Sequence, residues 1–123
     1  MVFQERTYSV LIVTASDSFT EKIMPLLPVT DYWPVTTAHS NSEARRRILE
    51  TAFDIVLINA PLPDDFGMRL AIDICTGSGA GVLLMVRSDQ FDDVYARVVG
   101  YGVLTLSRPT SVQMVAQNLR ILC

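Results

Sequence analysis

The sequence predicts an α/β fold, a (βα)5 doubly wound domain built on one five-stranded parallel sheet. Continuous apolar runs at residues 10–13, 55–58 and 82–86 have the character of strands that are buried on both faces. Segments with apolar residues at helical spacing alternate with these runs. Because right-handed crossovers place successive helices on the faces of a parallel sheet, a doubly wound arrangement is the simplest one that fits.

The first strand and helix occupy residues 10–28. The strand at 10–13 is followed by the sequence Ser-Phe-Thr-Glu, a capping-box pattern that predicts a helix with Ser18 as its N-cap. Pro25 should kink or shorten this helix, because proline cannot donate an interior helical hydrogen bond. Pro28 marks its end.

The second unit is a weaker strand at 34–38 and a helix that follows a second capping box at residues 40–43. We expect the apolar stripe of this helix to consist of Ala44, Ile48 and Leu49.

The other three units follow the same alternation of a strand and a helix. We predict strands at 55–58, 82–86 and 103–106, and helices at 67–75, 91–98 and 111–122.

Length, charge and cysteine content restrict the class of protein. The 123 residues are expected to form a single domain, 1–123. Thirteen acidic residues against ten basic ones argue against direct binding of nucleic acid by this domain. The two cysteines, Cys75 and Cys123, are too few for a zinc cage or a disulfide framework, and a reducing cytoplasm suits them. The apolar runs are too short to span a membrane.

Residues 54–67, with the sequence Asp-Ile-Val-Leu-Ile-Asn-Ala-Pro-Leu-Pro-Asp-Asp-Phe-Gly, resemble the third strand and following loop of response-regulator receiver (CheY-like) domains. Ser107-Arg108-Pro109 is similar to the Lys-Pro that follows the fifth strand in that family. The resemblance extends over nearly the whole chain and implies the flavodoxin-like receiver topology.

The residues that carry receiver chemistry differ in this chain. Asn59 stands where the family has its phosphorylated aspartate, and an amide lacks the anionic oxygen that forms an acyl phosphate. Thr14 and Ala15 stand where the family has the two acids that hold Mg²⁺. The resemblance is therefore to a degenerate receiver, with no catalytic residue, no metal and no cofactor, and we expect no enzymatic activity.

The switch positions of the family also differ. Its hydroxyl residue after the fourth strand falls on Val86, and its aromatic residue in the fifth strand falls near Thr105. The cation is retained as Arg108, for which the resemblance implies a cis bond to Pro109 and a place beside Asn59. We expect Arg108 to pair there with a carboxylate of the loop that contains Asp64 and Asp65.

Within the receiver family, the segments at residues 14–16, 58–67 and 102–109 look like the receiver-like halves of ANTAR-type regulators. In that family a small helical domain follows, binds nascent RNA and prevents transcription termination. The last predicted helix has no glycine or asparagine stop signal before Cys123, so we expect it to continue into such an output domain.

A homodimer is the expected assembly. Met114 and Ile121 lie seven residues apart and form a second apolar stripe on the last helix, opposite the stripe that faces the sheet. Asp93 and Arg97, four residues apart on the preceding helix, would supply a polar rim.

Two other functions remain open from the sequence. One is a flavodoxin-like protein that binds FMN at the hydroxyl-rich loop 14–18, although this loop has no glycine to let a phosphate approach. The other is a stand-alone receiver-like scaffold for protein contacts. A metal at Asp64 and Asp65 is not expected, because Thr14 and Ala15 would complete no carboxylate ligand set.

Overall fold

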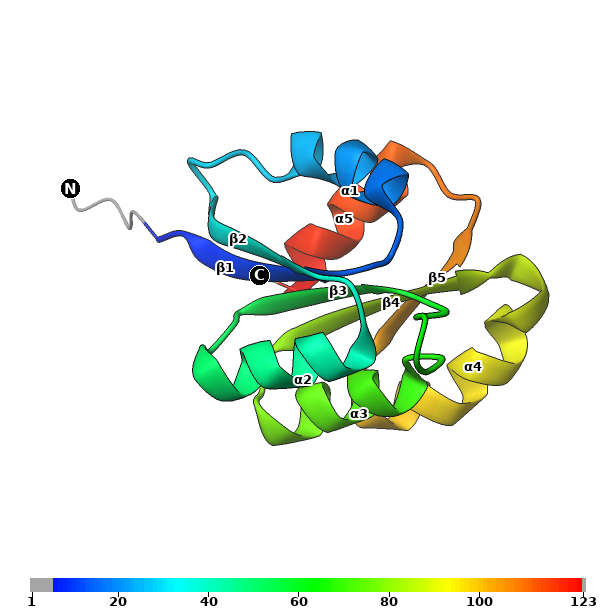
Figure 1. Ribbon diagram of the computed structural model, residues 1–123. Helices are drawn as coiled ribbons and strands as arrows, with labels where there is room; N and C mark the ends of the chain where they lie inside the picture. The colour runs from blue at the N-terminus through cyan, green and yellow to red at the C-terminus, as the bar shows by residue number, and fades with distance from the viewer. Residues whose placement is uncertain (1–5, 123) are drawn as a thin grey trace.

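The computed structural model describes residues 6–122 and confirms the predicted fold, a single parallel sheet with the strand order β2-β1-β3-β4-β5 (Figure 1). The strands are β1 (Tyr8–Val13), β2 (Tyr32–Ala38), β3 (Ile55–Asn59), β4 (Gly81–Arg87) and β5 (Leu104–Arg108). The helices are α1 (Asp17–Ile23), α2 (Asn41–Glu50), α3 (Met68–Gly77), α4 (Phe91–Val98) and α5 (Val112–Leu122). Three short 3₁₀ turns are η1 (Met24–Leu26), η2 (Ser88–Gln90) and η3 (Val99–Tyr101).

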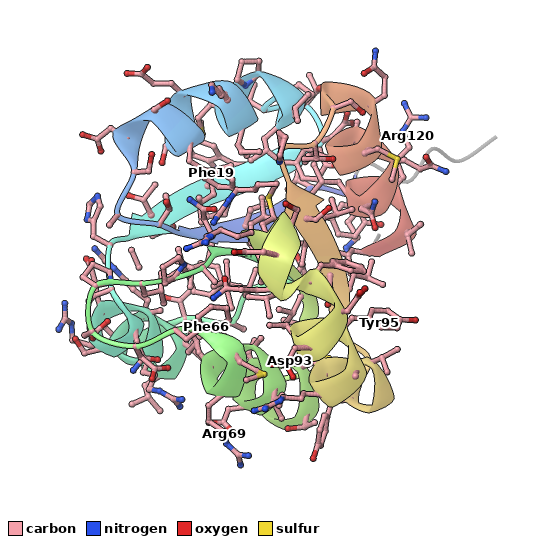
Figure 2. All side chains as sticks on the ribbon, turned by 90° about the vertical axis from the view of Figure 1, so that its right-hand side faces the viewer. Phe19, Phe66, Arg69, Asp93, Tyr95 and Arg120 are labelled. Carbon is pink, nitrogen blue, oxygen red and sulfur yellow. The ribbon has the colours of Figure 1, made fainter. Side chains whose placement is uncertain are left out.

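Helices cover both faces of the sheet, with α1 and α5 on one face and α2, α3 and α4 on the other (Figure 1). Each face has its own apolar core. Phe19 packs against the core on the α1 and α5 side, and Phe66 packs against the other (Figure 2). The central strands β1, β3 and β4 are buried on both faces, as their continuous apolar sequences predict.

The alternation of side chains along a strand decides which face each polar residue at the strand end meets. In β3, Ile58 belongs to the core under α2, α3 and α4, whereas Leu57 belongs to the core under α1 and α5. Asn59 lies two residues after Leu57 and therefore faces the α1 and α5 side. It stands at the carboxyl end of β3, beside β1, where the crossover direction reverses and doubly wound sheets bind ligands.

Helix α1 begins earlier than predicted, because Ser16 and not Ser18 is its N-cap. Ser16 has an extended backbone, and its Oγ accepts a hydrogen bond from the Phe19 amide at 3.1 Å. The Ser16 amide in turn donates to Thr14 Oγ1 at 3.0 Å, which turns the chain immediately after β1 and starts the helix two residues sooner. The regular helix ends at Ile23, and Pro25 lies in η1, so proline shortens this helix as expected.

The capping box of α2 is confirmed in part. Ser40 Oγ accepts from the Glu43 amide at 3.1 Å, but the Glu43 carboxylate accepts from the His39 amide at 2.7 Å and not from Ser40. This backbone hydrogen bond holds the pKa of Glu43 below its usual value, and the nearby side chains of His39 and Arg47 add to the effect. Glu43 thereby joins the end of β2 to the first turn of the helix.

Leu49 was expected in the apolar stripe of α2, but its exposed fraction is 89%. Ala44 is fully buried, and Ile48, four residues later, packs against the same core. A position five residues after Ala44 is turned about 140° around the helix, so Leu49 faces solvent.

No helix within residues 6–122 is long and apolar enough to cross a lipid bilayer.

Gly67 and Gly77 offer a matched test of the turn that follows the β3 loop. Gly67 has a φ of 113°, and a Cβ at this position would lie 3.2 Å from Ile58 Cγ2. We expect Gly67→Ala to lower the free energy of unfolding by about 1–3 kcal/mol, because an L residue is strained in this conformation. Urea denaturation measures this change.

The control for this prediction is Gly77→Ala at the end of α3, where a Cβ meets nothing within 4 Å. It should leave stability unchanged or raise it by up to about 1 kcal/mol, because alanine is the better helix former. Equal losses in both variants would mean that the backbone of Gly67 is not what requires glycine.

Candidate functional site

Three strand ends meet at one hydrogen-bonded chain of side chains. Asn59, at the end of β3, donates from Nδ2 to Thr14 Oγ1 at 3.1 Å. Arg108, the last residue of β5, donates from Nη1 to Asn59 Oδ1. Thr14 is 2% exposed and also accepts from the Ser16 amide, so its oxygen receives two hydrogen bonds. The site thus links the ends of β1, β3 and β5.

The amide of Asn59 suits this arrangement because it is a donor at one end and an acceptor at the other. Its nitrogen donates to the Thr14 oxygen, and its oxygen accepts from the Arg108 guanidinium. A carboxylate has only acceptors and could not donate to Thr14. The amide carries no charge, so it accepts a hydrogen bond from Arg108 without neutralising the positive charge of the guanidinium.

The structure brings together four of the six residues predicted for this site. Thr14, Asn59 and Arg108 are bonded as described, and Pro109 follows through the cis peptide bond that the resemblance implied. The other two residues are not part of this hydrogen-bonded group. Ala15 is exposed in the loop after β1, and Val86 is fully buried in the core under α3 and α4. In β5, Thr105 Oγ1 is buried without a hydrogen-bond partner among residues 6–122.

The expected ion pair between Arg108 and a loop carboxylate is wrong, because the chain uses both carboxylates elsewhere. Asp64 accepts hydrogen bonds from the Asn41 and Ser42 amides at 2.8 and 3.0 Å, at the N-terminus of α2. These bonds hold the pKa of Asp64 below its ordinary value. Asp65 accepts from the Gly67 amide at 3.2 Å. Among the described residues, no group of three His, Cys, Asp or Glu side chains could hold a metal ion.

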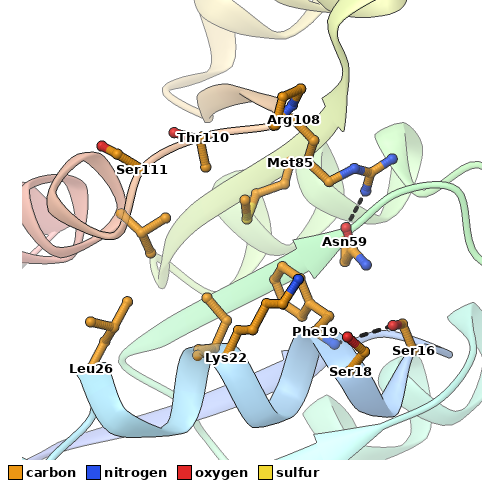
Figure 3. A pocket seen from close by; sticks show the side chains of 13 residues that line it. Ser16, Ser18, Phe19, Lys22, Leu26, Asn59, Met85, Arg108, Thr110 and Ser111 are labelled. Atoms are coloured by element: carbon orange, nitrogen blue, oxygen red, sulfur yellow. Dashed lines mark hydrogen bonds between the residues drawn. The ribbon is translucent and has the colours of Figure 1, made fainter.

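A cavity of about 640 Å³ opens beside the Asn59 chain, between α1 and α5 and over the ends of β3 and β4 (Figure 3). It is lined by Ser16, Ser18, Phe19, Lys22, Ile23, Leu26, Asn59, Met85, Arg108, Pro109, Thr110, Ser111 and Val115. Lys22, Met85 and Thr110 are residues that the sequence analysis did not single out. The only feature of the sequence that pointed to this cavity is the predicted topology, which places α1 and α5 on the same face of a doubly wound sheet.

Two cations line the cavity from opposite sides. Lys22 comes from α1, and Arg108 comes from the end of β5 (Figure 3). Within residues 6–122 neither side chain lies within ion-pair distance of a carboxylate. Burial lowers the pKa of Arg108 from its ordinary value, and the like charge of Arg87 adds to this effect. Arginine nevertheless remains protonated in proteins, so the cavity is positively charged.

The hydroxyl-rich loop after β1 is occupied by the chain itself. Thr14 Oγ1 accepts from the Ser16 and Asn59 nitrogens, and Ser16 Oγ accepts from the Phe19 amide. These oxygens therefore hold the turn and the start of α1, which is the role of a capping segment.

The residues predicted for an interface lie on α4 and α5. Met114 and Ile121 are 44% and 64% exposed. Asp93 and Arg97 form an ion pair at 3.4 Å on the exposed side of α4. Cys123, where we expected the last helix to continue, lies outside the described residues.

The bond between Asn59 and Arg108 can be measured by a double-mutant cycle. Asn59→Leu should lower the free energy of unfolding by about 1–3 kcal/mol, because Arg108 loses a partly buried acceptor and Thr14 loses a donor. We expect the coupling energy with Arg108→Met to be about 1 kcal/mol. The control pair is Asp93→Ala with Arg97→Met, an exposed ion pair whose coupling should stay below about 0.5 kcal/mol. Equal coupling in the two cycles would contradict a specific bond at the strand ends.

Neither a protein family model nor a curated protein sequence matches this chain. Solved structures do match it along almost its whole length. A two-component response regulator from Clostridium difficile has 17% identity and a TM-score of 0.81, covering 95% of both chains. The signal receiver domain of an HD domain-containing protein from Pseudomonas fluorescens Pf-5 has 20% identity and a TM-score of 0.82, covering 99% of this chain and 90% of that one.

A third match is the chemotaxis response regulator CheY4 of Vibrio cholerae, with 18% identity and a TM-score of 0.80, covering 96% of this chain and all of that one. Together with the strand order and the alternation of strands and helices, these likenesses show that the chain has the fold of response-regulator receiver domains.

Proposed function

We propose that this domain is a receiver-like signalling module that works without phosphorylation and acts by associating with a second copy of itself. The observation that carries the proposal is the Asn59 amide, which is hydrogen-bonded at both ends, to Thr14 and to Arg108. In a receiver the corresponding position bears the carboxylate that accepts the phosphoryl group. Here the same position is part of a neutral link between strands.

The chemistry of phosphoryl transfer supports this proposal. An acyl phosphate forms when an ionised carboxylate attacks phosphorus, and an amide does not supply such a nucleophile. Mg²⁺ requires several oxygen ligands, and carboxylates provide most of them in proteins. Asp64 is bonded to the α2 N-terminus, and Thr14 and Ala15 offer no carboxylate at the end of β1. We therefore propose a non-enzymatic role.

Incubation with acetyl phosphate and Mg²⁺ tests the first half of the proposal. Intact-mass spectrometry should show no adduct of about 80 Da, the mass added by phosphorylation. The variant Asn59→Asp should also stay unmodified, because the carboxylates that bind Mg²⁺ are still absent from the end of β1. An adduct in the wild type that disappears in Asn59→Ala would overturn the proposal.

The surface proposed for self-association is formed by α4, η3, β5 and α5. Of the large hydrophobic residues that are exposed in the described part of the chain, five lie on these elements, namely Tyr95, Val99, Tyr101, Met114 and Ile121. Figure 2 shows Tyr95 directed outward from α4. We propose that these side chains form one patch along the β5 edge, because patches of exposed apolar side chains are typical of protein contact surfaces.

Helix α5 supports this choice because it has apolar residues on two sides. Val115 and Leu119 are buried against the sheet, at 4% and 1% exposure. Met114 and Ile121, two turns apart, leave a second stripe that the domain does not cover. The Asp93–Arg97 ion pair, which the sequence predicted as a polar rim, lies on the opposite side of α4 from Tyr95, because residues two positions apart are turned about 200° around a helix (Figure 2). We therefore do not place this pair in the proposed surface. A second copy of this chain is the proposed occupant, with about 1,200 Å² buried in total.

Sedimentation at rising protein concentration tests this interface. Wild type should show a concentration-dependent dimer without any phosphate donor, and Met114→Glu and Ile121→Glu should each weaken it at least about tenfold, because a buried unpaired charge is costly. The control is Leu49→Glu, at an apolar residue of α2 that is also exposed, and this variant should dimerise as wild type does. Unchanged dimerisation in both α5 variants would show that the interface lies elsewhere.

We further propose that the module serves a two-component-type regulator with an RNA-binding antitermination output, as its resemblance to ANTAR-type regulators implies. The alternative is a stand-alone scaffold of the same fold. The gene beyond the codon of Cys123 distinguishes them: a further three-helix segment supports the antitermination regulator, and a stop codon supports the scaffold.

A further inference from the structure

We propose that the cavity between α1 and α5 is a binding site for a small organic anion with a carboxylate or phosphate-ester head and an apolar body. The inference goes beyond the module's self-association and does not rest on it. It is based on the charge, the size and the mixed polar and apolar lining of this cavity.

The charge of the cavity favours an anion. Lys22 and Arg108 both line it, and its lining contains no aspartate or glutamate. Neither cation has an ion-pair partner within residues 6–122, and Arg108 is hydrogen-bonded to the neutral amide of Asn59. Two uncompensated cations that face one partly enclosed space lower the free energy of an anion placed there.

The polar wall also offers donors for an oxyanion. The hydroxyls of Ser18, Thr110 and Ser111 line the cavity, from the α1 side and the α5 side respectively. Ser111 Oγ accepts from the Met114 amide at 3.1 Å, so its own proton can be donated. An anionic head between Lys22 and Arg108 would receive charge-assisted hydrogen bonds, which are the stronger kind.

Part of the lining is apolar, and an inorganic ion would leave this part without a matching contact. Its apolar residues are Phe19, Ile23, Leu26, Met85 and Val115. A volume of about 640 Å³ falls within the range of sites that hold drug-sized molecules and is far larger than one phosphate. The combination of two cations with several apolar side chains fits an amphipathic acid.

A property of the sequence makes the site directly observable. Lys22 is the only lysine of the chain. Reductive methylation with ¹³C-formaldehyde therefore labels one side chain besides the N-terminal amine, and it keeps the positive charge. The ¹³C-dimethyl signal of Lys22 reports on any anion that binds within the cavity.

The test is an NMR titration of this labelled protein with 1-naphthoate and, separately, with 1-naphthyl phosphate. We expect a saturable shift of the Lys22 signal with each probe, accompanied by shifts of the Met85 and Thr110 amides. The neutral analogue 1-naphthalenemethanol should bind at least tenfold more weakly, because it has the apolar body without the charge. Inorganic phosphate should bind at least tenfold more weakly too, because it lacks the apolar body.

Variants of the unlabelled protein, followed by their amide signals, give the second arm. Lys22→Gln and Arg108→Gln should each weaken binding of both probes five- to tenfold. The matched control is Arg120→Gln, which removes an exposed arginine of α5 that does not line the cavity and should leave the affinity unchanged. Absence of saturable shifts, equal affinity for the neutral analogue or for phosphate alone, or full affinity in Lys22→Gln would overturn the inference.

Discussion

The hydrogen bonds of the Asn59 amide are the contacts on which the carboxyl edge of the sheet depends. One small side chain connects the buried hydroxyl of Thr14 with the guanidinium of Arg108, and so ties β1 to β5 across β3 and β4. Each strand end carries a polar group that would otherwise lie at the boundary of an apolar core, where an unpaired donor or acceptor is costly. A neutral amide satisfies both partners, and it leaves the charge of Arg108 free to act on the space beside it.

The two faces of the sheet separate the charges at this edge. Asp64 binds the N-terminus of α2 on one side, where its carboxylate completes the backbone hydrogen bonding of the helix. Arg108 and Lys22 face the cavity on the other side, between α1 and α5. In a receiver, acids at the positions of Thr14, Ala15 and Asn59 and a cation at the position of Arg108 would meet around one phosphoryl group. Here the backbone amides of α2 bind Asp64, and Arg108 and Lys22 line the cavity on the other face of the sheet.

The sequence is sufficient to predict the layers of this fold and the Asn59–Arg108 neighbourhood, and it is insufficient for the contacts that complete them. Strands buried on both faces leave a continuous apolar pattern, which makes residues 10–13, 55–58 and 82–86 recognisable. Ser16 was overlooked as the N-cap of α1 because Ser18 also begins a capping-box pattern, and only the Thr14 hydrogen bond decides between them. Leu49 was misplaced because three apolar residues in one helix need not share a face.

The hydrogen-bond partners of the loop carboxylates and the cavity beside Arg108 could not be predicted from the sequence, for a different reason. Asp64 is equally able to bind a cation or two backbone amides, and the choice depends on where the N-terminus of α2 lies relative to the β3 loop. Lys22, Met85 and Thr110 are distant in sequence and carry no shared pattern. Their proximity follows from α1 and α5 packing on one face, so it belongs to the tertiary structure.

Helix α5 connects the two proposals made for this domain. Ser111 and Val115 line the cavity, whereas Met114 and Ile121 point to the surface proposed for self-association. An anion in the cavity and a second copy on the outer face would therefore contact the same helix. Such a ligand alters association only if its affinity differs between monomer and dimer, and the dimer must then alter ligand affinity by the same factor. A module without a phosphoryl group could respond to a signal by this linkage, because the charge that a receiver gains covalently would arrive here with a bound acid.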